Sequence, residues 1–288
     1  MKQKKFTTNK KLMASASMLL VSIMTLSSAT YAWFTMNKEV SVTGMEVKAK
    51  AYNGLVISGD NKSTWKTDWD VAMTTGVELY PTSTNGAASP SWAVAYSKDF
   101  DDANKNQTGS GATYADITPS YTTSGTTGDT FTNGVDGIGQ TGDPSRSYVL
   151  KKTFWIKSTG ESAWTSSINV KSVTAEVADT SGSGTANLNK ALRVLVVSGS
   201  DAFVYAPVTG YDNAINFKGT TAVTLVPATT SSNLASVTSI PNTDAGAIRV
   251  DMYIYYEGED QNCKSSNIAA ISVDTLKVSA EFEATQTP

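Results

Sequence analysis

The chain has 288 residues, a formal net charge of −3 and 40% hydrophobic residues, enough for a core in one large or two small domains. It contains no histidine, which excludes a Ser-His-Asp triad, a Cys-His pair and a His-ligated zinc site. The acidic balance argues against binding nucleic acid or anionic lipid, because nucleic-acid affinity depends on clustered Lys and Arg.

The first 32 residues have the order of a secretory signal peptide. A basic run ends at Lys11, an apolar-rich segment runs from Leu12 to Ala29, and the small Ala32 precedes Trp33. The pattern predicts cleavage between Ala32 and Trp33, and a secreted, extracellular or cell-surface protein that meets the membrane only through this peptide. These residues carry five lysines and no acid, so the net charge of the mature chain falls from −3 to −8.

A retained membrane anchor is the alternative interpretation of the segment from Leu12 to Ala29. A spanning helix needs about 20 mostly apolar residues. The segment contains several serines, among them Ser15, Ser17 and Ser22, which make it polar for such a helix. The composition therefore favours the cleaved signal peptide.

The next segment, residues 33–44, is predicted to be an N-terminal arm. Val40 and Val42 are even-numbered and lie on one face of an extended chain, whereas the next apolar residues, Met45 and Val47, are odd-numbered. The alternation of apolar residues therefore shifts by one position at Gly44. Glycine is the usual residue at a β-bulge. Gly44 is therefore either a simple bulge or a hinge between the arm and the first strand of the domain.

Residues 45–288 are predicted to form an antiparallel β-sandwich of jelly-roll type, because apolar side chains recur with period two. The segment 248–256 indicates a half-buried strand with Tyr253 and Tyr255 on its outer side. The segment 276–284 places Val278 and Phe282 inside and Glu281 outside. The nearly continuous apolar run 191–197 indicates a strand covered on both faces.

Three other stretches complete the predicted organisation. Asp68–Thr74 and Asn187–Ala191 each suggest a single helical turn. Residues 83–147 are rich in turn formers with scattered aromatic residues, which indicates a loop-rich insertion with short hairpins on one side of the sandwich.

Acidic residues gather at two places. Asp99, Asp101 and Asp102 could bind calcium, but the segment lacks the glycine and the closing glutamate of an EF-hand loop, so a solvated acidic turn is favoured. The segment Glu257–Asp260 has the same interpretation. We therefore predict no metal site and no cofactor, with calcium as the one alternative.

Other reactive or aromatic residues give two alternatives each. The single cysteine, Cys263, is either a small buried residue or a free thiol that crosslinks chains, since no internal disulfide can form. Trp65, Trp69, Trp92 and Trp164 either cover the core or stack on sugars. Nothing in the sequence brings two carboxylates together for glycoside hydrolysis, so we predict no catalytic residue and no enzyme.

Two stretches carry a resemblance to a known family. The segment Thr30–Thr35 before a short strand resembles the Gram-positive TasA/camelysin group, which is exported with a SipW-type signal peptidase. The segment 248–263 resembles one common in Firmicutes surface proteins that share this signal type. Camelysin-like relatives are described as metallopeptidases, and the absence of histidine departs from that activity.

The resemblance implies a structural subunit of an extracellular filament or biofilm matrix that assembles by donor-strand complementation. In this mechanism a strand from one copy fills the groove of the next, and the head-to-tail contact propagates as a homopolymer. Trp33, Phe34, Val40 and Val42 would form the donor strand, with Gly44 as the hinge. The alternative is a monomeric surface adhesin or carbohydrate-binding module.

The signal peptide gives a first testable prediction. Mass spectrometry of the secreted protein should show an N-terminus at Trp33 or within a few residues of it. A secreted or surface protein that retains residues 1–29 would contradict both the export route and the free N-terminal arm.

Overall fold

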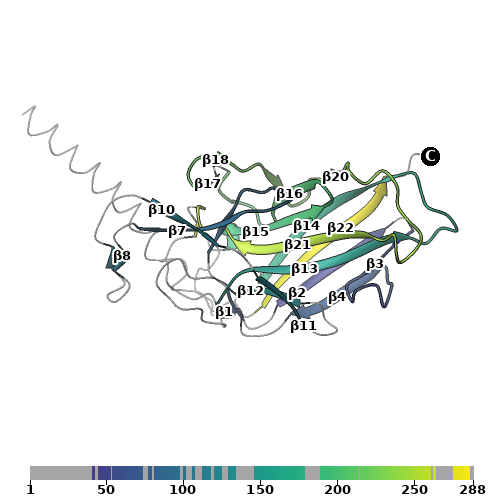
Figure 1. Cartoon of the computed structure of the whole chain (residues 1–288), viewed down its shortest axis with the longest axis horizontal. Coiled ribbons are helices and arrows are strands. Elements are labelled where there is room, and N and C mark those ends of the chain that lie inside the picture. The colour runs from purple at the N-terminus through teal and green to yellow at the C-terminus, as the bar shows by residue number, and fades with distance from the viewer. Residues whose placement is uncertain are drawn as a thin grey trace, which may run out of the picture.

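The computed structural model describes the chain in segments, and almost all regular structure in them is β (Figure 1). A single-turn 3₁₀ helix at residues 189–191 is the exception among these residues. The predicted all-β sandwich is therefore confirmed. The described residues are 41–42, 45–52, 54–73, 77–79, 81–97, 100–101, 106–107, 112–117, 120–124, 129–133, 146–178, 189–213, 215–260, 262–263 and 275–285.

The large sheet has ten strands, seven of which follow the order β1-β5-β13-β21-β15-β16-β19. The other three are β3 and β12, which pair with β13 on the edge opposite β21, and β11, which pairs with β12. Most pairs are antiparallel, whereas β5 with β13 and β16 with β19 are parallel. The strands are β1 (Ser41–Val42), β3 (Leu55–Ser58), β5 (Val77–Leu79), β11 (Ser120–Ser124), β12 (Asp129–Asn133), β13 (Arg146–Ser158), β15 (Leu192–Ser198), β16 (Asp201–Ala206), β19 (Leu225–Pro227) and β21 (Ile248–Tyr256).

The second layer is a five-stranded sheet in the order β20-β14-β22-β2-β4. Here β2 and β22 run parallel, and the other neighbours are antiparallel. Its strands are β2 (Met45–Tyr52), β4 (Asp68–Met73), β14 (Ser167–Ala178), β20 (Ser232–Leu234) and β22 (Thr275–Thr285).

The main hydrophobic core lies between these two sheets. Alternate residues of β2, β14 and β22 face alternate residues of β13, β15 and β21, as the period-two pattern requires. The Tyr205 hydroxyl on β16 donates a hydrogen bond to the Val170 carbonyl on β14 at 3.3 Å and so ties the layers together. Fully buried members include Phe154, Val196, Val250, Met252, Leu276 and Phe282.

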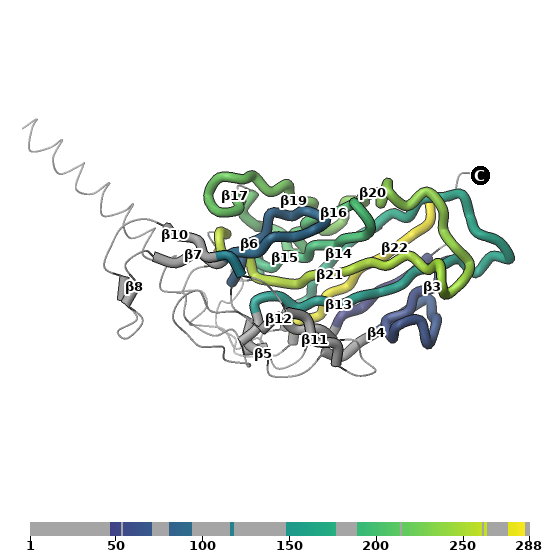
Figure 2. The backbone as a smooth tube through the Cα atoms, viewed as in Figure 1, coloured from purple at the N-terminus to yellow at the C-terminus, as the bar shows by residue number. Residues whose placement is uncertain are grey.

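A third, smaller layer covers the outer face of the large sheet. It contains the sheet β10-β7-β6 and the hairpin β17–β18, and Figure 2 shows β6 crossing the large sheet near β15 and β16. A second apolar cluster, including Trp92, Leu195 and Tyr253, fills the space beneath it. The strands are β6 (Ser83–Thr84), β7 (Trp92–Ser97), β10 (Ala112–Ile117), β17 (Asn216–Phe217) and β18 (Thr221–Ala222), while β8 (Phe100–Asp101) and β9 (Asn106–Gln107) form a separate pair.

This outer layer explains one success and one error of the sequence analysis. Every residue of β15 is buried, which confirms the strand predicted to be covered on both faces. The prediction that Tyr253 and Tyr255 form an outer row on a half-buried strand is wrong. Trp92 packs against both rings, with centroids 5.9 and 5.1 Å away, and leaves the two tyrosines 5% and 0% exposed.

Both predicted helical turns can also be checked. Asp68–Met73 is the strand β4, because it pairs antiparallel with β2 along six residues, so the helical prediction there is wrong. Long-range pairing overrides a weak local preference in this case. At the second place, residues 189–191 do form a helical turn directly before β15.

The shift in the alternation of apolar residues at Gly44 corresponds to a change of sheet. β1 belongs to the large sheet, where Ser41 pairs with Glu78 and Val42 with Val77. β2 belongs to the five-stranded sheet and begins at Met45, directly after Gly44. Gly44 itself lies outside the described residues.

Neighbouring residues of β22 provide a matched test of this packing. Phe282 is fully buried between the sheets, whereas Glu281 lies on the outer face, where its carboxylate meets the Tyr52 hydroxyl at 3.0 Å and Lys171 at 3.6 Å. We expect Phe282→Ala to lower the free energy of unfolding by about 3–5 kcal/mol. Glu281→Ala should cost less than about 1 kcal/mol. Similar small losses in urea titrations of both variants would contradict this arrangement.

Candidate functional site

The most unusual polar feature among the described residues is the turn of residues 257–263, directly after β21. Main-chain hydrogen bonds hold it on both sides. The Glu257 amide donates to the Ala191 carbonyl at 2.8 Å, and the Gly258 amide donates to the Thr82 carbonyl at 2.9 Å. The turn is therefore clamped between the start of β15 and the segment before β6.

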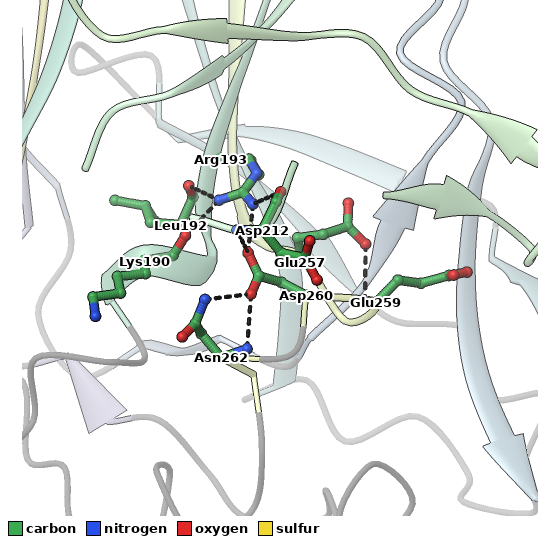
Figure 3. A network of polar contacts seen from close by, with 8 residues as sticks. All are labelled: Lys190, Leu192, Arg193, Asp212, Glu257, Glu259, Asp260 and Asn262. Atoms are coloured by element: carbon green, nitrogen blue, oxygen red, sulfur yellow. Dashed lines mark hydrogen bonds and ion pairs between the residues drawn. The ribbon is translucent and has the colours of Figure 1, made fainter. Parts of the chain in front are cut away.

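A buried ion pair lies at the centre of this turn (Figure 3). Arg193 on β15 places its Nη2 atom 2.5 Å from Oδ2 of Asp260, and both side chains are 0% exposed. Arg193 also donates from Nη1 to the carbonyl oxygens of Lys190 and Leu192 at 2.6 and 2.9 Å. A longer contact of 3.5 Å runs from Nη2 to the Asp212 carbonyl.

The Asp260 carboxylate is equally well satisfied. Its Oδ2 atom also accepts the Asp212 amide at 3.2 Å, and its Oδ1 atom accepts both the amide and the side-chain Nδ2 of Asn262, each at 2.7 Å. This one carboxylate therefore joins β15, the loop at Asp212 and the end of the turn. We call this group, Arg193, Asp212, Asp260 and Asn262, the buried latch.

Such a latch fixes the position of the chain more than it adds stability. Moving both charges out of water costs several kcal/mol for each ion, and the attraction within the protein offsets this only when the geometry is good. Removal of one partner would leave the other charge buried and unpaired. Among the described residues, the Nε atom of Arg193 and the nearby Tyr255 hydroxyl have no hydrogen-bond partner, so the polar site is not fully saturated.

Glu257 is the second carboxyl group buried in this turn, with 1% exposure. Burial raises its pKa from 4.5 to about 8, an effect that the hydrogen bond from the Glu259 amide and the charge of Arg193 only partly oppose. The Glu259 amide lies 3.1 Å from Oε1 of Glu257. At neutral pH the side chain is therefore mostly a protonated, uncharged acid beside the charged latch.

Cys263 closes the turn. Its amide donates to the Asp260 carbonyl at 2.8 Å, and its side chain is fully buried against the main core. Burial and the nearby carboxyl groups raise the pKa of its thiol. A buried, protonated thiol is a poor nucleophile, so the structure favours the buried-residue interpretation over a crosslinking thiol.

The prediction that Glu257–Asp260 is a solvated acidic turn is wrong, since Glu257 and Asp260 are both buried. The patterns considered above did not single out Arg193, the residue that neutralises Asp260 from 67 positions away. A lone arginine in an otherwise apolar run, Ala191–Val197, was the available signal. A charge in a strand that is covered on both faces needs a buried partner.

The other predicted site residues are mostly outside the described residues. This applies to Ala32, Trp33, Phe34, Val40 and Gly44, while Val42 lies in β1. Asp99 and Asp102 are also outside, and Asp101 ends β8, so calcium binding stays a prediction. In the described part of the chain, no three acidic or cysteine side chains are grouped to hold a metal ion.

Two of the four tryptophans proposed as sugar platforms belong to the hydrophobic cores. Trp69 is 9% exposed and Trp92 is 2% exposed. Trp65 and Trp164 are half-buried, and the Lys157 ammonium lies 4.5 Å from the Trp65 ring. A ring that is already covered offers little surface for stacking on a sugar.

One surface hollow of about 380 Å³ lies between β7, β10 and the β17–β18 hairpin. Its floor includes Trp92, Ile117 and Phe217, which are all less than a tenth exposed. At its rim Lys218 and Asp116 form an ion pair of 2.5 Å, so the charged groups already satisfy each other. The hollow therefore presents few free groups that could recognise a ligand.

Comparisons of the chain with protein-family models, curated proteins and solved structures gave no match. Within the described residues, no helix combines the length and the apolar character needed to span a membrane.

Glu257 gives a prediction for the pH dependence of stability. Its pKa is higher in the folded than in the unfolded chain, so the stability from this group is fully present below pH 4.5 and is lost as the pH rises toward 8. The slope from one such group is at most about 1.4 kcal/mol per pH unit. We expect Glu257→Gln to remove this slope in urea titrations between pH 4.5 and 8.

Phe282→Ala is the control, because it lowers stability without changing a carboxyl group and should keep the wild-type slope. A Glu257→Gln protein with the wild-type pH dependence would contradict the buried, protonated state of Glu257.

Proposed function

We propose that this protein is a secreted structural subunit of an extracellular filament or surface matrix, assembled by donor-strand complementation. The observation that supports this most directly is the position of β1. Among the described residues it is the last strand at one end of the large sheet, where Ser41 and Val42 pair with β5. The predicted arm therefore includes an edge strand of this sheet.

An arm that leaves from a sheet edge can extend β pairing into another molecule. An exposed edge presents main-chain N–H and C=O groups, and a strand that adds to it gains hydrogen bonds as well as apolar contacts. Val40 and Val42 alternate along the arm, so both would face the same groove. Because donor and acceptor are different surfaces of the same protein, each bound copy still presents a free acceptor, and the contact propagates.

The resemblance of the signal-peptide junction and of residues 248–263 to the TasA/camelysin group supports the same proposal. The acidic mature chain is consistent with a surface protein that binds itself and not nucleic acid or anionic lipid. The alternative of a monomeric carbohydrate-binding module has less support, because it needs accessible aromatic rings and the floor of the one hollow described above is buried.

The test uses the mature protein that begins at Trp33. Negative-stain electron microscopy and mass photometry should show polymers of the wild-type protein. Val40→Asp combined with Val42→Asp should abolish them, because each carboxylate would enter an apolar groove without a partner. The matched control, Asn37→Asp with Thr43→Asp, adds the same charge to the opposite face of the arm and should still polymerise.

Two results would count against the proposal. If the wild-type mature protein stays monomeric at high concentration, the filament function is wrong. If the Val40 and Val42 variant forms the same polymers as the wild-type protein, the arm is not the donor strand.

A further inference from the structure

The strand β22 has the most extensive pairing of the five-stranded sheet, although it is the last strand described. Eleven residues pair antiparallel with β14, and eight residues pair in parallel with β2. Its inward side chains fill the centre of the main core, with exposures between 0% and 4%; they are Leu276, Val278, Ala280, Phe282 and Ala284. Both main-chain edges and one complete face of this strand are thus satisfied by its neighbours.

Removal of β22 would leave a slot that fits a single strand. Within the described residues, β2 has only β4 as its other neighbour, and β14 has only the three-residue pairing with β20. Two unpaired edges would then face each other across the width of one strand. The floor of this slot would be the apolar face of the large sheet, including Val194 and Met252. Edges of this kind are templates for pairing with another chain.

The chain before β22 is anchored independently of it. The turn 257–263 is clamped onto the large sheet by the buried latch and by the contacts of Glu257 and Gly258. Eleven residues, 264–274, then separate Cys263 from the start of β22. Fully extended, they span roughly 36–40 Å, whereas packed sheets lie only about 10 Å apart. A connection of this contour length is long enough to carry β22 away from its own sandwich.

We propose that β22 is an exchangeable strand, which can leave its own sandwich and fill the same slot in a second copy of this chain. The strand makes identical contacts in either copy, so the two forms differ mainly in the path of the connection 264–274. The fraction of exchanged protein then depends on the protein concentration. Only a strand in the correct register with β14 and β2 fits the slot, because a slip of one residue would turn Phe282 toward solvent. A second copy of this chain supplies such a strand.

The two edge strands of this sheet do not fit this role. The strands β4 and β20 lie at the two edges of the five-stranded sheet, so removing either opens one edge and no slot. The exchange of β22 does not depend on the N-terminal arm, and therefore it goes beyond the proposed function.

The test is disulfide trapping in the full mature chain, with Cys263→Ala to remove the native thiol. Thr174 on β14 and Ser279 on β22 are directly opposite each other on the outer face of the sheet. Opposite residues of an antiparallel pair have Cα atoms about 4.5–5.5 Å apart, which suits a disulfide. The double variant, Thr174→Cys with Ser279→Cys, should therefore form a disulfide within one chain and confirm the register.

The decisive sample is a mixture of the two single-cysteine proteins, refolded together at high concentration and then mildly oxidised. Exchange predicts a disulfide between a Thr174→Cys chain and a Ser279→Cys chain, with a yield that falls when refolding is done at high dilution. The matched control mixes Lys48→Cys with Asp70→Cys, whose positions face each other across β2 and β4. These strands stay within one sandwich, so the control should give only the background of random collisions.

A yield of mixed disulfide no higher than that of the control would overturn the exchange of β22. Polymers without mixed disulfides would leave the filament function in place and still reject the exchange. Mixed disulfides in soluble dimers would support the exchange even if the arm-dependent filament fails.

Discussion

The parallel pairing of β2 with β22 is the constraint on which the rest of the sandwich depends. It joins the first long strand of the domain, which begins at Met45, to the last, which ends at Thr285. Without it the five-stranded sheet would divide into the pair β2–β4 and the three strands β20-β14-β22. One of the two walls of the core would then be split. A contact between residues so distant in sequence closes a very large loop, which carries a high entropic cost and makes folding slow.

The buried latch fixes one part of the chain between these two strands, the turn that follows β21. By fixing the end of β21 against the start of β15, the Arg193–Asp260 pair determines where the chain leaves the large sheet on its way to β22. Packed apolar side chains of similar volume could hold the same turn at lower desolvation cost. Charges satisfied by specific donors, such as those of Asn262 and Asp212, accept only one geometry. We therefore interpret the latch as a contact that fixes the position of the turn 257–263 relative to β15.

Local patterns predicted much of the fold but little of this site. Alternation placed Phe282 inside, and the unbroken apolar run identified β15, because both follow from the period of a strand. The same alternation could not show that a third layer covers Tyr253 and Tyr255, since periodicity identifies a face and not what packs on it. The acidic turn was misjudged for a related reason. Whether Asp260 meets water or Arg193 depends on a contact between distant segments, which composition does not encode.

The topology also connects the two proposals for assembly. Under the proposed export route the N-terminal segments would leave the membrane first, so β2 and β4 would be present before β22 can reach them. Until then Val47, Ala49 and Ala51 lack their neighbour in the sheet, and the edge of β2 is open. An arm such as residues 33–42 carries alternating valines that suit an open edge of this kind. The β22 strand of the same chain would compete with it through more pairs and more buried apolar surface. Such a competition favours the closed sandwich within one molecule, because the longer strand takes the slot, and the arm would then have to pair with a different sheet edge of a partner.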